Sequence, residues 1–188
     1  MNLRKALLVC LVIGIALSMQ VAQAQTDIGF KKAGVKVGYV MPGGIDNTLG
    51  FGAMVDLGTI TKDFHLDAFF DYWSKSYGEG VYDWSWSMMS FGALVKYYFP
   101  LNSSNLLPYS GAGLGLNMWS SKWDYTGPTG LGYPTTYDAS GSNIALHVVG
   151  GIEMPLSPKL DGLAEFKYST GDADYVGIFV GVLYRFGE

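Results

Sequence analysis

Apolar and polar residues alternate with a period of two along most of the chain. This is the period of a β-strand, whose successive side chains point to opposite faces, whereas an amphipathic helix repeats about every 3.6 residues. Clusters rich in Gly, Pro, Asn, Asp and Ser separate the alternating segments. There are eight segments: residues 33–41, 49–60, 63–74, 86–99, 108–119, 143–154, 160–170 and 175–186. The sequence therefore predicts an all-β fold.

The connections between these segments differ in length. Residues 75–85 and 120–142 form two long connections that are rich in aromatic residues and glycine. In an up-and-down antiparallel barrel every second connection lies at the same end. The two long connections therefore share one end with the short connections 42–48 and 171–174. The opposite end carries residues 61–62, 100–107 and 155–159.

Sorting each segment into odd and even positions separates an uncharged face from a polar one. The uncharged face is apolar in every segment, as in Val35, Val37 and Tyr39 of the first. The polar face holds most of the glycines and the charged residues Lys36, Asp56, Asp67, Asp71, Lys96, Glu153, Glu165, Lys167 and Arg185. These five acids and four bases nearly cancel, as charges enclosed away from water must. We expect them to form a structural network of ion pairs.

Two architectures have one apolar face per strand: a soluble barrel or sandwich with that face inward, and a membrane barrel with that face in lipid. A soluble protein needs a densely charged outer face, yet the polar face here is mainly glycine, and only 15% of all residues are charged. Aromatic residues also mark both ends of the uncharged face, as in the two interfacial belts of a membrane barrel. One group is Phe64, Tyr97, Phe99, Tyr184 and Phe186, and the other is Tyr39, Phe51, Tyr72 and Tyr168.

The pattern therefore predicts a transmembrane sheet, and a bilayer tolerates a sheet only when it closes into a barrel without open edges. An interior of eight strands is just wide enough for side chains. We expect a plugged lumen with small conductance.

The N-terminus has the pattern of a secretory signal peptide. Arg4 and Lys5 precede the apolar run 6–17, and Ala22 and Ala24 occupy the small-residue positions of a cleavage site. The run is shorter than the roughly 20 residues of a membrane-spanning helix. We therefore expect residues 1–24 to be removed and residues 25–188 to form one barrel domain.

Export would leave an acidic chain without cysteine. Cys10 is the single cysteine and lies in the expected signal peptide, so the mature chain has neither a disulfide nor a thiolate metal site. Loss of Arg4 and Lys5 changes the formal charge from −4 to −6. With no basic cluster, such a chain is not expected to bind nucleic acid.

Three stretches resemble the small outer-membrane β-barrel superfamily that includes the OmpA transmembrane domain, OmpX and OmpW. They are PYSGAGLGL (108–116), GGIEMPLSPKLDGLAEFKYS (150–169) and the closing VGIFVGVLYRF (176–186). The last resembles the terminal strand that the barrel-assembly machinery recognises, although Gly187 and Glu188 follow Phe186, which the family usually places last. The resemblance implies an eight-stranded antiparallel barrel in the outer membrane of a Gram-negative-type bacterium. It specifies the fold far better than an activity.

The chemistry of the polar face does not predict an enzyme. His65 and His147 are the only histidines, and neither has a second histidine or a cysteine at metal-ligand spacing. We expect no cofactor and no metal. Lipid A modification remains an alternative, but it needs a nucleophile and a base that these positions do not supply.

The long-connection end is crowded with aromatic residues: Tyr77, Tyr82, Trp84, Trp86, Trp119, Trp123, Tyr125, Tyr133 and Tyr137. Rigid aromatic side chains favour a binding patch for a protein, a glycan or lipopolysaccharide. Alternatively, the third to sixth strands continue past the bilayer and these rings pack on one another.

Together these features predict a monomeric barrel with a structural or surface-interaction role, such as membrane integrity or adhesion. Its expected partners are the lipid bilayer, lipopolysaccharide, the barrel-assembly machinery and a host or matrix ligand. The alternative function is transport or binding of a small solute or hydrophobic ligand.

Overall fold

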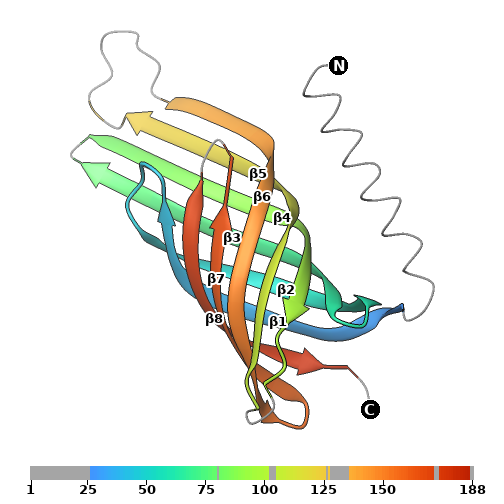
Figure 1. The fold of residues 1–188 in the computed structure, drawn as a ribbon. Helices are drawn as coiled ribbons and strands as arrows, with labels where there is room; N and C mark the ends of the chain where they lie inside the picture. The colour runs from blue at the N-terminus through green and yellow to red at the C-terminus, as the bar shows by residue number, and fades with distance from the viewer. Residues whose placement is uncertain are drawn as a thin grey trace, which may run out of the picture.

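The computed structural model describes residues 26–79, 81–101, 105–125, 127, 136–171 and 174–186. The expected signal peptide, residues 1–24, lies outside the described residues. Eight strands follow one another along the chain (Figure 1): β1 (Asp27–Pro42), β2 (Thr48–Thr61), β3 (Phe64–Glu79), β4 (Tyr82–Tyr98), β5 (Leu107–Tyr125), β6 (Thr136–Ser157), β7 (Leu160–Ser169) and β8 (Tyr175–Arg185). No helix among these residues is both long and apolar enough to cross a membrane.

The strands form one closed antiparallel barrel. Each strand pairs with the next along the chain, and β8 pairs with β1 through contacts such as Val35 with Val182. Closure leaves no open sheet edge in the barrel wall. The predicted fold, an eight-stranded antiparallel up-and-down barrel, is confirmed.

Strands β3 to β6 are longer than the alternation predicted. The connections expected at 75–85 and 120–142 are largely strand, because β3 and β4 pair as far as Glu79 with Tyr82, and β5 and β6 as far as Asp124 with Thr136. The prediction of long loops was therefore wrong for most of these residues. Period-two alternation does continue there, but aromatic residues now occupy the inward positions and serine many of the outward ones, so the apolar signal changes face.

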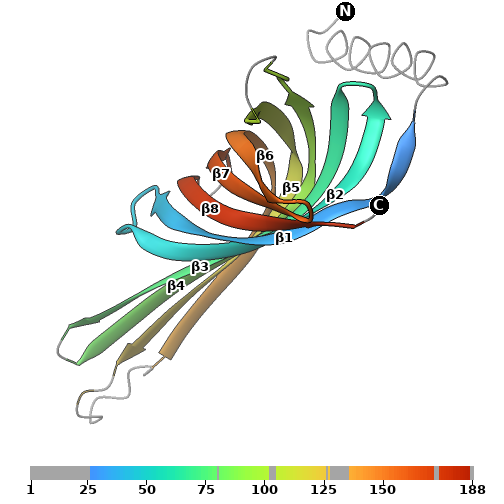
Figure 2. The ribbon, with the colours of Figure 1, turned by 90° about the horizontal axis from the view of Figure 1, so that it is seen from below.

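These longer strands project beyond the rest of the barrel as a four-stranded sheet (Figures 1 and 2). We call this sheet the extension. It comprises residues 74–79 of β3, 82–87 of β4, 119–125 of β5 and 136–142 of β6.

Burial alternates along the strands as the two-face pattern requires. In β7, the side chains of Asp161, Leu163, Glu165, Lys167 and Ser169 are buried, whereas the residues between them are more exposed. The uncharged face of the sequence therefore forms the outside of the barrel, and the polar face points into the lumen.

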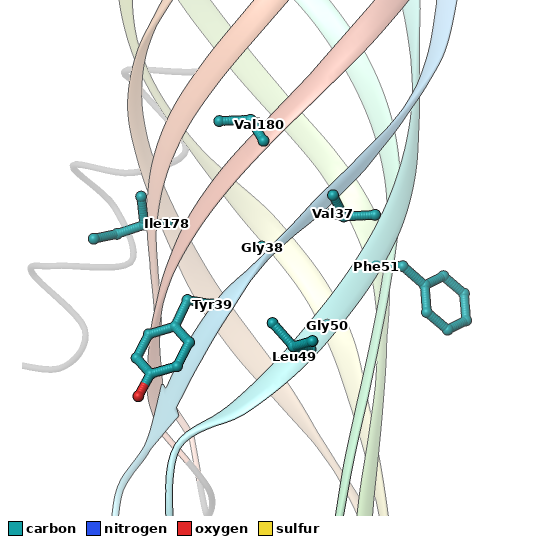
Figure 3. A pocket seen from close by; sticks show the side chains of 8 residues that line it. All are labelled: Val37, Gly38, Tyr39, Leu49, Gly50, Phe51, Ile178 and Val180. Carbon is teal, nitrogen blue, oxygen red and sulfur yellow. The ribbon is translucent and has the colours of Figure 1, made fainter.

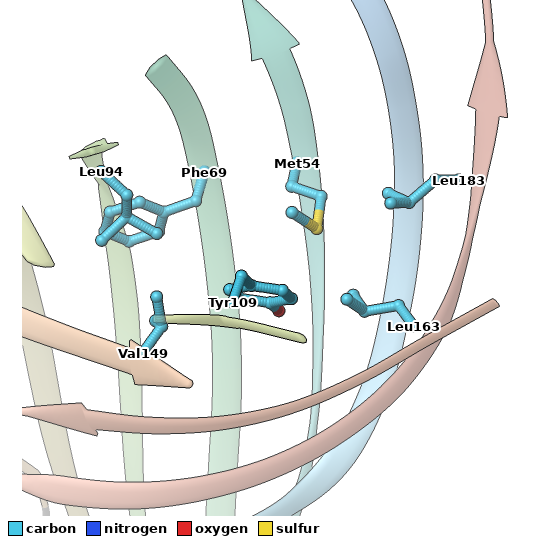
Figure 4. Close-up of a cluster of buried hydrophobic side chains, with 7 residues drawn as sticks. All are labelled: Met54, Phe69, Leu94, Tyr109, Val149, Leu163 and Leu183. Carbon is cyan, nitrogen blue, oxygen red and sulfur yellow. The ribbon is translucent and has the colours of Figure 1, made fainter. Parts of the chain in front are cut away.

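The lumen is more apolar than the sequence predicted. Seven inward side chains form one buried cluster (Figure 4): Met54, Phe69, Leu94, Tyr109, Val149, Leu163 and Leu183. A second cluster contains Val40, Trp73, Met88, Tyr175 and Phe179. Along β3 the inward positions read Asp67, Phe69, Asp71 and Trp73, so charged and apolar side chains interleave. The lumen is therefore packed as a mixed core and not only with glycine and ion pairs.

Candidate functional site

The centre of the barrel holds a cross-strand network of lysines and carboxylates. The ammonium of Lys36 on β1 lies 2.6 Å from Glu165 on β7 and 3.1 Å from Asp71 on β3. Lys167 on β7 donates to the other oxygen of Asp71 at 2.6 Å. Glu165 also accepts a hydrogen bond of 2.8 Å from the hydroxyl of Tyr109 on β5. All five side chains are buried. Each of the four charged groups among them lies within 3.1 Å of a group of opposite charge.

Lys96 joins this network from β4. Its ammonium lies 2.7 Å from Asp67 on β3 and 3.9 Å from Glu165, and it also sits 4.5 Å above the ring of Tyr109. The sequence neighbours Val95 and Tyr97 point to the outside of the barrel. Strand alternation therefore places one lysine of an otherwise apolar segment in the lumen, where its charge is paired.

A second group of ion pairs lies at the end of the barrel where β1 begins and β8 ends. Lys32 lies 2.6 Å from Glu153 and 2.9 Å from Asp161, and Arg185 contacts the same Asp161. The hydroxyl of Tyr98 donates to Glu153 at 2.7 Å. The alternation pattern did not single out Lys32 and Asp161. The expected first strand began at residue 33, and Asp161 stands at the very start of its segment, so neither was counted as a charge of a strand centre.

Asp56 and His147 have other surroundings. Asp56 accepts the backbone N–H of Gly58 at 2.7 Å and lies 3.3 Å from Nδ1 of His65. His147 is buried with its ring edge against Phe69, and neither ring nitrogen has a hydrogen-bond partner among the described residues. Within the part of the chain that the structure describes, no three His, Cys, Asp or Glu side chains are grouped to hold a metal ion.

The outer wall presents a continuous apolar surface. Its side chains include Leu114, 63% exposed, and Ile144, 77% exposed. On β1, β2 and β8 they leave an open groove of about 640 Å³ (Figure 3), lined by Val37, Gly38, Tyr39, Leu49, Gly50, Phe51, Ile178 and Val180. Aromatic pairs flank the wall, with Phe51 against Tyr72 toward the extension and Phe64 against Tyr97 toward the opposite end. This surface is suited to hydrocarbon.

The inward face of the extension carries the aromatic residues that the sequence singled out. Tyr77, Trp84, Trp123 and Tyr137 are paired in register straight across the four strands. Stacked pairs hold the face together: Tyr77 with Trp84 at 5.0 Å, Tyr82 with Trp123 at 5.4 Å and Trp86 with Trp119 at 4.9 Å between ring centroids. Tyr125 lies 5.2 Å from Tyr82. Tyr133 lies outside the described residues.

Both interpretations of these aromatic residues have structural support. The rings do pack on one another beyond the barrel wall, and the indole of Trp84 donates to Ser121 at 2.9 Å. Some ring surface nevertheless stays open, since Tyr82 is 48% and Tyr137 67% exposed. The β1–β2 connection braces this face, because the backbone N–H of Asp46 donates to the hydroxyl of Tyr77 at 2.6 Å. The result is a rigid, partly exposed aromatic sheet.

The model of one protein family, the outer membrane protein beta-barrel domain, matches residues 8–186. The chain belongs to this family. Membership places the barrel in the outer membrane, with its apolar wall in contact with lipid. Comparison with curated proteins gives no match.

Solved structures of outer-membrane barrels have the same fold. Neisserial surface protein A is 21% identical, with 82% of this chain and 96% of that chain covered and a TM-score of 0.61. A major outer membrane protein from Thermus thermophilus is 13% identical, with 82% and 98% covered and a TM-score of 0.59. Ail, the attachment invasion locus protein of Yersinia pestis, in complex with the heparin analogue sucrose octasulfate, is 18% identical, with 84% and 99% covered and a TM-score of 0.57. At these identities the similarity concerns the fold.

Proposed function

We propose that this protein is a non-catalytic surface-contact barrel, in which a plugged membrane domain holds the aromatic extension outside the cell. The observation that carries the proposal is the in-register row of Tyr77, Trp84, Trp123 and Tyr137 on strands that continue beyond the lipid-facing wall. Tyrosine and tryptophan provide large contact areas at a low cost in conformational entropy, which suits a recognition surface.

The packing of the lumen supports a structural role over transport. Lys96, Lys167 and Glu153 are each at most 1% exposed, although all three point into the barrel. Toward the extension, Trp86, Trp119 and Ile45 pack on the second apolar cluster. A solute would have to displace both buried ion pairs and aromatic rings, so we expect very small conductance.

The charge of the extracellular end favours an uncharged contact surface on the partner. The described residues there include Lys75 and Lys122, against Asp46, Asp83, Asp124 and Asp138. Sucrose octasulfate, which Ail holds, is a polyanion. Because acids outnumber bases here, a sulfated ligand would be repelled. We propose neutral surfaces of host or matrix material as the ligand.

Biogenesis and assembly complete the proposal. The chain is exported through a cleaved signal peptide, residues 1–24, and β8 together with Phe186, which follows it, is recognised by the barrel-assembly machinery. The folded protein is a monomer in a membrane that contains lipopolysaccharide. Closure of β8 on β1 supports a monomer, because the barrel wall needs no partner chain to complete its sheet.

Adhesion of whole cells tests the role. Cells that produce the protein should bind to immobilised matrix proteins or neutral glycans, and Trp84→Ala with Trp123→Ala should abolish that binding while the barrel still folds. Planar-bilayer recordings with large stable conductance would instead support the transport alternative, and a change in lipid A mass on overproduction would support an enzyme. If the double variant keeps both its adhesion and every other surface contact of the native protein, the proposal is contradicted.

A further inference from the structure

The outward face of the barrel has a groove where the apolar wall meets the extension. It has a volume of about 420 Å³ and crosses β3 to β6. Its lining consists of Tyr72, Ser87, Met89, Met118, Trp119, Ser120, Ser140, Gly141 and Ser142. One part of the lining is therefore aromatic and thioether, and the other part is hydroxyl.

Strand register makes the boundary between these two parts sharp. Tyr72, Met89 and Met118 are paired side by side on β3, β4 and β5. The next outward-facing row toward the extension consists entirely of serine: Ser74, Ser87, Ser120 and Ser140. Successive rows on one face of a strand lie about 7 Å apart. On β3 to β5 the lining thus changes from apolar to hydroxyl within one row, at the end of the lipid-facing wall, whereas on β6 Ser142, the partner of Met118, already places a hydroxyl in the preceding row.

The polar part of the groove is uncharged and open to new hydrogen bonds. No hydroxyl of Ser87, Ser120 or Ser140 is hydrogen-bonded to another side chain within the described ranges. Trp119 also belongs to the lining, but its ring lies on the inward face, stacked on Trp86, and its indole N–H is buried, so this group is not offered to the groove. Lys122 is the nearest cation on the same face of β5, and its ammonium is 3.0 Å from Asp124. The groove therefore offers neutral donors and acceptors and no free positive charge.

This combination distinguishes the groove from the one on β1, β2 and β8. That groove is lined only by apolar side chains, glycine and Tyr39, so any acyl chain fits it equally well. The groove on β3 to β6 adds a row of hydroxyls where a headgroup would begin. It is continuous with the lipid-facing wall, so its occupant approaches from the outer leaflet.

We infer that this groove binds a lipid of the outer leaflet that has a saccharide headgroup. An acyl chain lies against Tyr72, Met89 and Met118, and sugar hydroxyls exchange hydrogen bonds with the serine row. A hydroxyl both donates and accepts, as a sugar requires, whereas a phosphate headgroup would call for a free lysine or arginine. The bound lipid fixes the base of the extension on the membrane. This inference does not depend on the proposed adhesive role.

Native mass spectrometry of the full mature chain, folded in detergent, tests the inference. Digalactosyl diacylglycerol, phosphatidylglycerol and phosphatidylethanolamine with identical acyl chains serve as probes. We expect the galactolipid to bind about tenfold more tightly than either phospholipid. Each lost hydrogen bond weakens binding by roughly twofold to tenfold, so Ser87→Ala, Ser120→Ala and Ser140→Ala combined should abolish this preference. Ser76→Ala with Ser85→Ala, on the same face but outside the groove, is the matched control and should retain it.

Three outcomes overturn the inference: equal binding of all three lipids, an unchanged preference in the triple variant, or tightest binding of phosphatidylglycerol. Heat-modifiable migration on a gel verifies that each variant is folded. The triple variant should still support adhesion, because its serines face away from Trp84 and Trp123. Failure of the lipid experiment is thereby distinguishable from failure of the proposed function.

Discussion

Lys96 lies 2.7 Å from Asp67 in the lumen, although residues on both sides of it along β4 face lipid. The two residues come from neighbouring strands, where Lys96 pairs with His65 and Asp67 with Leu94, so the lysine reaches diagonally to its carboxylate. Neither side chain is more than 1% exposed. An uncompensated charge at this depth is strongly destabilising.

Removing one partner of this pair should lower the free energy of unfolding much more than removing both partners. Lys96→Met alone leaves Asp67 unpaired, and we expect it to lower the free energy of unfolding by about 3–5 kcal/mol. Lys96→Met combined with Asp67→Leu should recover most of that loss. Urea titration of tryptophan fluorescence in detergent measures the cycle, with Lys62→Met in the exposed β2–β3 turn as control. Additive effects of the two substitutions would rule out a coupled buried pair.

Glu165 is the carboxylate shared by two lysines and Tyr109, so its removal should be among the most damaging changes in the lumen. Glu165→Ala is expected to lower the thermal midpoint in detergent by about 10 °C, from a loss of about 3–5 kcal/mol. Glu165→Gln keeps the acceptor for the Tyr109 hydroxyl and should lose less. Heat-modifiable gel migration against temperature gives both midpoints. Equal midpoints for Glu165→Ala and the native protein would show that this carboxylate is hydrated and not buried.

A charge on the outer wall should be tolerated only beyond the lipid boundary. Leu114 and Ser120 are on the same outward face of β5, with Leu114 in the apolar wall and Ser120 in the serine row. In lipid vesicles, Leu114→Arg is expected to lower the free energy of unfolding by about 2–4 kcal/mol, as arginine does near the bilayer midplane. Ser120→Arg should lower it by about 0–1 kcal/mol. Equal costs for the two variants would argue against a bilayer around the wall.

The stacked pair of Trp86 and Trp119 should stabilise the extension much more than the strands of the barrel that lie far from it. Their rings are nearly parallel, with an interplanar angle of 8°. Trp86→Ala removes about 0.5–1.5 kcal/mol of aromatic interaction. Amide hydrogen exchange should therefore accelerate most over residues 82–87 and 119–125 and stay unchanged in β7, which supplies no residue to the cluster on which Trp86 packs. Ser85→Ala, on the opposite face, is the control. Uniform acceleration over all strands would mean that the extension is part of the same folding unit.

The strands and their two faces were predictable because alternation is a local property. A residue such as Lys36 shares its face with every second neighbour, and a closed barrel leaves only two choices for that face. All nine charged residues assigned to the polar face do point into the lumen or to its rim. The role proposed for them, a structural plug, rests on the packing described above.

The contacts across the lumen were not predictable, because they depend on the stagger of the strands and on the tilt of the barrel. Tyr109 on β5 reaches Glu165 on β7, and no sequence pattern relates these two positions. The interleaved apolar side chains, such as Phe69 and Leu94, were missed for a related reason. A packed lumen needs apolar volume as well as paired charges. The odd or even position of a leucine along its strand gives the face on which it lies, but not how deeply its side chain is buried. The extension itself matches the sequence-based alternative that the third to sixth strands continue past the bilayer. Its strand bounds were wrong, because its apolar residues change from the outward to the inward face.

Lipid surrounds the uncharged wall and ends at the serine row, and nitroxide labels along one face of β5 locate this boundary. Cysteines are placed one at a time at Ala112, Leu114, Leu116, Met118, Ser120 and Lys122, with Cys10 replaced by serine. In vesicles, we expect the label at position 114 to collide with oxygen but not with a water-soluble nickel complex, and the label at position 122 to behave in the opposite way, with the crossover near position 120. Strong collisions with nickel at every position, 114 included, would place this wall in water and exclude a bilayer around it.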